Sequence, residues 1–358
     1  MSLVVIAGGG TGGHLFPGIA LAETLVARGA RVTFVGTAAG IEVHAVPAAG
    51  FPLELIPGAQ VRGGGVVRMV RGLATTAAGI VRALGLLRTL RPALVVGVGG
   101  YASVAMVLAA RLRRIPVLLL EQNTVPGFAS RSLGRVADRI CVGFAEAARF
   151  FPPGRVVHTG NPVRAAILAA PSIPHEGLGI LVFGGSQGAR HVNEALLAAA
   201  GRLGPALARC RIRHQTGTAD HERVVAGWAR LGITARVDPF VVDMGTAYAE
   251  ADLVVARAGA MSCAEITARG LPAILVPYPH AADDHQRHNA EVLGAAGAAR
   301  MILDRDLDGD RLATVLRPLL DDGDLRTQMT AAARAAGRPD AALQVAQVCE
   351  ALIRVGSA

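Results

Sequence analysis

The sequence contains no lysine, so all 36 of its basic residues are arginines. A P-loop of the form GxxxxGKS/T uses a lysine at the phosphates, and this absence removes the main support for an ATPase or GTPase. Only 4% of the residues are aromatic, which leaves few surfaces on which bases could stack and argues against nucleic acid as a partner. The net charge of +9 therefore points to another anionic partner, a nucleotide or an acidic membrane surface.

Paired cysteines and a long spanning segment are also missing. The four cysteines lie far apart without a CxxC pair, which argues against a zinc site and a disulfide framework and fits a reducing cytosol (Cys141, Cys210, Cys263 and Cys349). No basic residue precedes the first apolar run, so no secretory signal is predicted. Residues 93–110 are uncharged and almost long enough to span a membrane, but their glycine-rich centre predicts a strand, a turn and a helix.

Short runs of Val, Ile and Leu alternate with longer helical patterns along most of the chain. Runs that are apolar at consecutive positions indicate parallel strands buried on both faces, so we predict an α/β protein with doubly wound sheets. Strand-like runs end in the glycine-rich turns GGGTGGH near residue 8 and GGSQGAR near residue 184. These predict two Rossmann-like domains, residues 1–163 and 164–337, facing a cleft at the carboxyl ends of their strands. A helix over 338–358 is expected to pack back on the first domain.

The first glycine-rich turn lies directly before a helix and contains a single histidine. Glycines let backbone N–H groups approach an anion closely, and the helix N-terminus favours negative charge. His14 then becomes a candidate for proton transfer near neutral pH. The alternatives are a tight turn that only needs positive φ and an ordinary surface histidine.

The second domain offers two further loops. Ser186 and the backbone of residues 186–188 suit a diphosphate at a helix start, although a plain strand-to-helix turn would look the same. In RAGAMSCAEI, Glu265 could accept hydrogen bonds from two sugar hydroxyls, or it could be an acidic residue favoured by the helix dipole.

Two acidic stretches imitate metal sites. DDHQRHNA, with Asp284 and His285, matches no zinc or non-haem iron spacing. DRDLDGDRLATVL resembles a calcium loop but has Val315 at its twelfth position, where a bidentate glutamate is required. We therefore predict no metal site, and a helix-capping turn in the second stretch.

Residues 61–92 carry six arginines among apolar residues. Such a helix could lie on an anionic membrane with its arginines among the headgroups. The alternative is an amphipathic helix that packs on the core in the ordinary way.

Taken together, IAGGGTGGHLFPGIALA, LLLEQNTVPG, TGNPVR, FGGSQGARHVN, RAGAMSCAEI and HQRHNA occur in the same order, over essentially the whole chain, as in the MurG family of bacterial glycosyltransferases. The resemblance implies the GT-B fold and transfer of N-acetylglucosamine from UDP-N-acetylglucosamine (UDP-GlcNAc) to lipid I, giving lipid II. This reaction serves peptidoglycan synthesis and hence cell-wall biogenesis, cell shape and division. The resemblance also implies a peripheral location on the cytoplasmic face of the plasma membrane, no cofactor, and other cell-wall synthesis proteins as partners.

The resemblance implies roles for individual residues. His14 and Glu121 would be catalytic, and Tyr101 would face the acceptor. Residues from both domains would bind the donor: Thr11, Gly12, Gly13, Asn123, Arg164, Ser186, Val241, Ala260, Met261, Ser262, Cys263, Ala264, Glu265 and Gln286.

The sequence departs from the family pattern at Leu120, where a histidine is usual, at GGYASVA instead of GGYVSGP, and at Val242 instead of aspartate. Three other functions stay open. One is a different GT-B enzyme, such as a glycolipid glycosyltransferase or a UDP-GlcNAc 2-epimerase, and another is a non-catalytic scaffold. The third, an NAD-dependent oxidoreductase, needs an acidic residue at the end of the second strand, where Gly36 and Thr37 stand.

Overall fold

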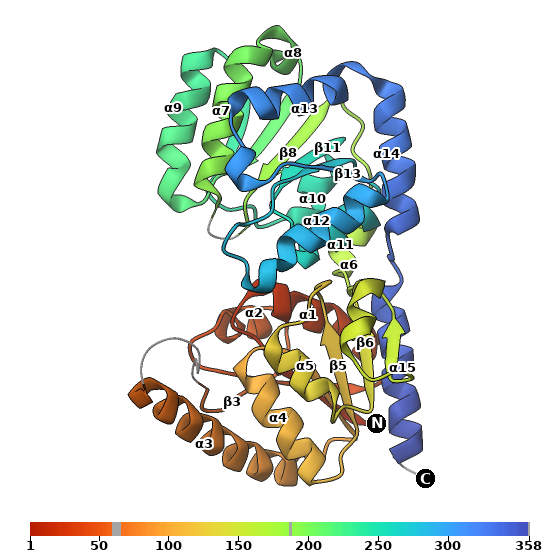
Figure 1. The fold of residues 1–358 in the computed structure, drawn as a ribbon. Helices are drawn as coiled ribbons and strands as arrows, with labels where there is room; N and C mark the ends of the chain where they lie inside the picture. The colour runs from red at the N-terminus through yellow and green to blue at the C-terminus, as the bar shows by residue number, and fades with distance from the viewer. Residues whose placement is uncertain (59–65, 186–187, 357–358) are drawn as a thin grey trace. The chain divides into compact units, whose positions relative to one another are not determined.

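The computed structural model describes residues 1–58, 66–185 and 188–356. The chain forms two compact units (Figure 1), one of Met1–Arg164 with the chain from Asp340 onward, the other of Ala165–Pro339. The chain therefore passes from one unit to the other between Arg164 and Ala165 and again after Pro339.

The first unit is built on a parallel sheet of seven strands in the order β3-β2-β1-β4-β5-β6-β7. Val4 of β1 pairs with Val32 of β2 on one side and with Leu94 of β4 on the other. The strand order thus reverses between β1 and β4, the point at which open α/β sheets bind ligands. The strands are β1 (Leu3–Gly8), β2 (Arg31–Gly36), β3 (Leu53–Leu55), β4 (Leu94–Gly99), β5 (Val117–Glu121), β6 (Arg139–Val142) and β7 (Val156–His158).

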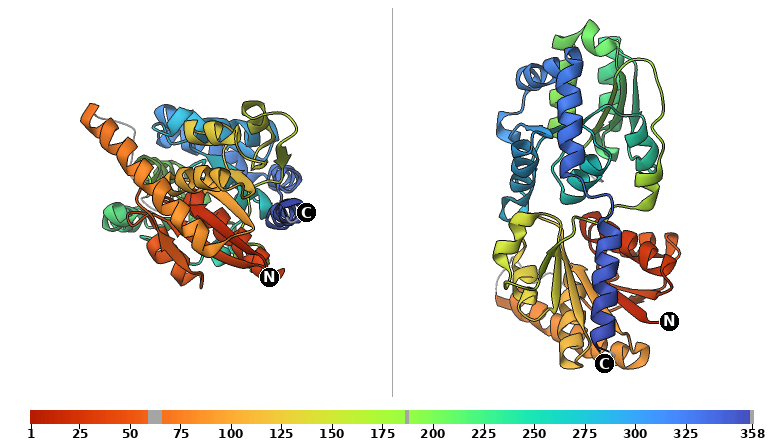
Figure 2. Two further views of the ribbon diagram at one scale, coloured as in Figure 1. Left: turned by 90° about the horizontal axis from the view of Figure 1, so that it is seen from below. Right: turned by 90° about the vertical axis from the view of Figure 1, so that its right-hand side faces the viewer.

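Helices cover both faces of this sheet. Val4 and Ile6 point to a core shared with α1 (Gly12–Ala27) and α15 (Ala341–Gly356), whereas Val5 and Ala7 point to the core beneath α3 and α4. The last helix therefore packs on the first unit, as Figure 2 also shows. The other helices are α2 (Glu42–Ala48), α3 (Val66–Leu90), α4 (Tyr101–Leu112), α5 (Phe128–Gly134) and the 3-10 turn η1 (Ala145–Phe150).

The second unit repeats the plan with six parallel strands in the order β10-β9-β8-β11-β12-β13. The strands are β8 (Gly179–Phe183), β9 (Arg211–Gln215), β10 (Ala235–Asp238), β11 (Leu253–Ala256), β12 (Ala273–Leu275) and β13 (Ala299–Met301). Its helices are α6 (Ala165–Ala169), α7 (Arg190–Leu203), α8 (Pro205–Ala208), α9 (His221–Leu231), α10 (Met244–Ala249), α11 (Ala260–Ala268), α12 (His285–Ala295), α13 (Gly309–Asp321) and α14 (Gly323–Ala336), with 3-10 turns η2 (Thr218–Asp220), η3 (Ala282–Asp284) and η4 (Asp304–Asp306). The two sheets confirm the predicted doubly wound α/β fold.

Two ambiguous stretches are settled by the structure. Residues 93–110 form β4, a glycine turn and most of α4, as predicted, and no helix in the described ranges is both long and apolar enough to cross a bilayer. Asp308 caps α13, because its Oδ1 accepts from the Arg311 N–H at 2.7 Å. The calcium-like stretch is therefore the predicted capping turn.

Candidate functional site

The glycine-rich turn after β1 lies at the point where the first sheet reverses its order. Gly9 has φ +148°, and a Cβ there would overlap the carboxylate of Glu42. The backbone can therefore take this path only with glycine. The Gly9 N–H donates to the Gly99 carbonyl at 3.3 Å, which joins this turn to the equivalent turn after β4.

Glu42, at the start of α2, stabilises the glycine-rich turn after β1 through hydrogen bonds. Its carboxylate is buried and accepts from the Gly10 N–H at 2.7 Å, the Thr37 N–H at 2.9 Å and the Thr37 hydroxyl at 3.0 Å. Burial raises the pKa of Glu42, but these hydrogen bonds outweigh it, and the pKa is lowered below its usual value. The carboxylate is thus fully engaged in bracing the turn, and it stabilises the fold above the ordinary glutamate pKa and less as the pH falls.

His14 stands in the first turn of α1 and is half-buried. Its Nδ1 lies 3.2 Å from Oε1 of Gln122, in the segment after β5. Its ring lies over Gly99, where any Cβ would meet the imidazole. The predicted proton-transfer residue is therefore held from two sides by the ends of β4 and β5.

The N-terminus of α1 is open to a ligand. Thr11 and Gly13 are exposed, Gly12 is half-buried, and the Thr11 side chain does not cap the helix within the described residues. The Arg164 guanidinium lies 4.5 Å from the centre of the Phe16 ring, one turn along the helix. A guanidinium beside a helix N-terminus that no side chain caps forms an arrangement that favours anions.

The remaining predicted residues of the first unit differ in exposure. Glu121 is buried, and its Oε1 accepts from the Asn123 N–H at 3.0 Å and from the Asn123 amide at 3.4 Å. Tyr101 begins α4 and is 42% exposed. Glu121 therefore orders Asn123, while Tyr101 is available at the surface.

In the second unit the segment 260–265 forms the start of α11, directly after β11. Gly259 is the N-cap residue and has no side chain with which to cap the helix, so the first N–H groups are left for a ligand. Ser262 and Ala264 are half-buried, whereas Ala260, Met261, Cys263 and Glu265 are buried. Burial raises the pKa of Cys263 to about 12, which makes it a structural thiol.

Glu265 has a partner that the sequence did not indicate. The fully buried Tyr248 donates its hydroxyl to Glu265 Oε2 at 3.0 Å. Gln286 accepts from the Tyr278 N–H at 3.0 Å through its Oε1, which turns its amide nitrogen away from that contact. Val241 is buried, and Ser186 lies outside the described residues.

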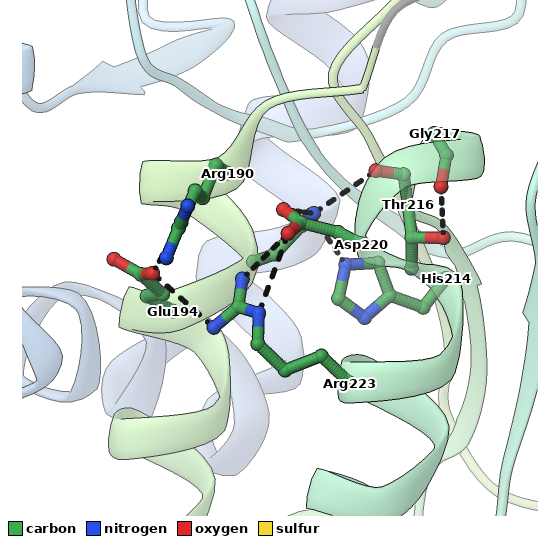
Figure 3. Close-up of polar contacts among 8 residues, drawn as sticks. Arg190, Glu194, His214, Thr216, Gly217, Asp220 and Arg223 are labelled. Atoms are coloured by element: carbon green, nitrogen blue, oxygen red, sulfur yellow. Dashed lines mark hydrogen bonds and ion pairs between the residues drawn. The ribbon is translucent and has the colours of Figure 1, made fainter.

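A polar network in the second unit links α7, the end of β9 and the segment that leads into α9 (Figure 3). Asn193, on α7, donates to the Thr216 carbonyl and to Asp220 Oδ2, both at 3.0 Å, and accepts from His214 Nε2 at 3.0 Å. Trp228 donates to His214 Nδ1 at 3.2 Å. The network ties the start of α7 to the end of β9 and so fixes where α7 begins.

The acidic stretches make internal contacts. Asp304 binds Arg257 and accepts from His191 Nδ1 at 3.0 Å. Among residues 1–58, 66–185 and 188–356, no three His, Cys, Asp or Glu side chains are grouped so that they could hold a metal ion.

Comparisons with known proteins identify the family. The model of the glycosyltransferase family 28 N-terminal domain matches residues 4–142, and that of the C-terminal domain matches residues 179–345. A protein of Pelobacter propionicus is 46% identical over 95% of this chain and 96% of its own length, and one of Myxococcus xanthus is 44% identical over 98% and 92%. Both are named UDP-N-acetylglucosamine--N-acetylmuramyl-(pentapeptide) pyrophosphoryl-undecaprenol N-acetylglucosamine transferase. The crystal structure of Acinetobacter baumannii MurG is similar with a TM-score of 0.78 and 33% identity, covering 97% of this chain and 99% of that one.

The chain belongs to the MurG family of glycosyltransferases.

More distant GT-B structures share only the fold. A putative UDP-N-acetylglucosamine 2-epimerase from Listeria monocytogenes has a TM-score of 0.68 but is 15% identical, over 96% of this chain and 95% of its own. The predicted GT-B architecture is thus confirmed, and the membership of the MurG family rests on the full-length relatives.

The departures from the MurG pattern lie in different surroundings. Leu120 is buried in the core shared with α1 and α15. Val242 is 85% exposed, beside the buried Val241. Ala102 and Ser103 of GGYASVA are buried in α4.

Sequence reasoning overlooked two residues of this MurG-family site, Glu42 and Gln122. Gln122 stands in the EQN motif, between two residues that were singled out, so its position next to a strand end was a usable signal. Glu42 offered none, because it lies 32 positions from the glycine whose N–H it binds.

Proposed function

We propose that this protein transfers N-acetylglucosamine from UDP-GlcNAc to the C4 hydroxyl of lipid I, the undecaprenyl-diphosphate-linked muramoyl pentapeptide, and so makes lipid II for peptidoglycan. One observation carries the proposal: relatives with this activity in their names are 44–46% identical and match over more than nine tenths of both chains. The Listeria monocytogenes epimerase shares the fold at only 15% identity, which supports no activity for this chain.

The chemistry is a single in-line displacement that inverts the anomeric carbon. The acceptor hydroxyl must lose its proton as it attacks, and a general base contributes about 10²- to 10⁴-fold in rate. We assign this role to His14. Glu121 is assigned an electrostatic or orienting role that acts through Asn123, because the Glu121 carboxylate accepts a hydrogen bond from the Asn123 N–H. Tyr101 is assigned to the acceptor side.

The leaving UDP gains negative charge, which Arg164 and helix N-termini would stabilise. Arg164 is already held against α1 by Phe16. The start of α11, with Glu265 and Ser262, is assigned to the ribose and sugar of the donor, together with Gln286 and the backbone at Val241. Residues 11–13 and Ser186 are assigned to the diphosphate, and no metal is required for these steps.

We propose further that the first unit lies on the cytoplasmic face of the plasma membrane, as a peripheral protein among other cell-wall synthesis proteins. The inner face of α3 packs on the core through Ala83, Leu86 and Leu87. Its outer face carries Val81, 70% exposed, next to the exposed Arg82. Apolar side chains beside arginines are suited to an anionic bilayer surface.

The test is incubation of the purified protein with lipid I and UDP-GlcNAc labelled in the sugar. We expect labelled lipid II, and His14→Ala should lower kcat at least tenfold while calorimetry shows that UDP-GlcNAc binding is largely kept. Transfer to diacylglycerol or release of epimerised sugar, without lipid II, would refute the assignment. Equal turnover by wild type and His14→Ala would remove His14 as the base.

A further inference from the structure

We infer that Gln122 fixes the tautomer of His14, so that the neutral imidazole carries its proton on Nδ1 and leaves Nε2 free to accept one. This inference rests on the proposed function, in which His14 is the base. It concerns a positioning residue that acts through His14.

The orientation of the Gln122 amide follows from its surroundings. The side chain is buried, with 2% exposure, and its nitrogen lies 3.1 Å from the Val98 carbonyl oxygen and 3.4 Å from that of Leu120. Carbonyl oxygens only accept hydrogen bonds. The donor end of the amide must therefore face them, and the opposite flip would place oxygen against oxygen.

With the amide nitrogen turned toward these carbonyls, Oε1 is the atom that faces His14 Nδ1, at 3.2 Å. An amide oxygen cannot donate, so the contact is a hydrogen bond only when His14 Nδ1 bears the hydrogen. Which nitrogen of a histidine is protonated is set by the partner of the other. In the neutral ring Nε2 then holds a lone pair.

The main chain of Gln122 and the ring of His14 are both held in place. Asn161 is buried and donates to the Gln122 carbonyl at 2.9 Å. On the other side the ring lies over Gly99, whose φ of +107° and missing Cβ make room for it. The imidazole therefore cannot move far from the Gln122 amide without losing its packing against Gly99.

The direct test is ¹⁵N NMR of the wild-type protein with histidines labelled in the ring, at about pH 8, with His14→Gln for assignment. We expect the His14 Nδ1 resonance to be that of a protonated nitrogen and Nε2 that of an unprotonated one. The reverse pattern would overturn the inference, and this readout does not depend on any enzymatic activity.

The kinetic test is Gln122→Met, which keeps the length of the side chain but removes the amide. We expect a fall in kcat of roughly tenfold, within the range that a general base contributes, an unchanged KM for UDP-GlcNAc, and an NMR signature with Nε2 protonated. Gln344→Met on α15 is the matched control and should behave like wild type.

The outcomes separate the two proposals. If wild type makes lipid II and a folded Gln122→Met keeps both kcat and the Nδ1-protonated ring, the inference is wrong and the function stands. If wild type makes no lipid II, the function is wrong, and the NMR pattern alone decides the tautomer. Circular dichroism and donor binding verify that the variant is folded.

Discussion

His214 is a buried histidine that the fold keeps neutral, which makes the stability of the second unit depend on pH in a calculable way. Its Nδ1 accepts from Trp228 and its Nε2 donates to Asn193, as Figure 3 shows in part. Protonation would put an N–H on Nδ1 against the N–H of Trp228. Burial lowers the pKa of His214 from 6.5 to about 4, although Asp220 acts in the opposite direction.

The sign follows from which state binds the proton. Between about pH 6.5 and pH 4 the unfolded chain protonates this histidine and the folded protein does not, so the free energy of unfolding falls as the pH is lowered. Above this window His214 contributes nothing to the pH dependence, and below it the loss is complete. One pKa unit corresponds to about 1.4 kcal/mol, so lowering the pH from about 7 to about 4.5 should cost between about 2 and 3 kcal/mol.

The assay is urea unfolding followed by the fluorescence of Trp228. This is the only tryptophan in the chain and it lies in the second unit, so the signal reports that unit. His214→Gln keeps a donor and an acceptor but cannot titrate, and we expect it to lose this part of the pH dependence. The matched control is His280→Gln, at an exposed histidine, which should retain it. The reasoning fails if wild type and His214→Gln have the same dependence between about pH 7 and pH 4.5.

Three further predictions concern the first unit. Glu42→Gln turns a donor toward the Gly10 N–H and should lower the free energy of opening this turn by about 2–3 kcal/mol, so that hydrogen exchange at the Gly10 amide becomes roughly 30- to 150-fold faster. The control Glu23→Gln, on the exposed face of α1, should leave this exchange rate unchanged. Unaltered exchange in Glu42→Gln would contradict the proposal that Glu42 holds the turn in place. Arg164→Gln should lower kcat/KM for UDP-GlcNAc roughly 10- to 100-fold, and wild type should stay active in EDTA. If activity depended on a divalent ion, Arg164 and the helix N-termini would not be sufficient to stabilise the charge of the leaving UDP. Val81→Glu should reduce co-sedimentation with anionic vesicles several-fold, while turnover of a short-chain lipid I analogue is kept. If wild type and Val81→Glu bound the vesicles equally, this face of α3 would not be the membrane-binding surface.

The sequence predicted the sheets well because each central strand is a run of consecutive apolar residues. No such run marks β3, β7 and β13, which have three residues each and lie at sheet edges. An edge strand pairs with a neighbour on one side only and is often very short in natural proteins, so it leaves little pattern in the sequence. The central strands could therefore be predicted from their apolar runs, whereas these three short edge strands could not.

The candidate site was predicted only as far as local patterns reach. A glycine-rich turn, a histidine and a helix start are adjacent in the sequence, and the structure keeps them adjacent. The residues that brace them come from afar, since Gln122 is 108 positions from His14. Tyr248 likewise reaches Glu265 across the interior of the second unit, so burial of that carboxylate could not be foreseen from a helix-start pattern.

The return of α15 to the first unit has a consequence for how the protein is made. Val345, Ala346 and Cys349 fill the same core as Val4 and Leu25, so that core can close only after α15 has been synthesised. The second unit has all of its residues between Ala165 and Pro339 and can fold while the last helix is still being synthesised. The first unit thus begins to emerge first but completes its core last, and until then the apolar side chains that α15 covers stay exposed, which favours aggregation.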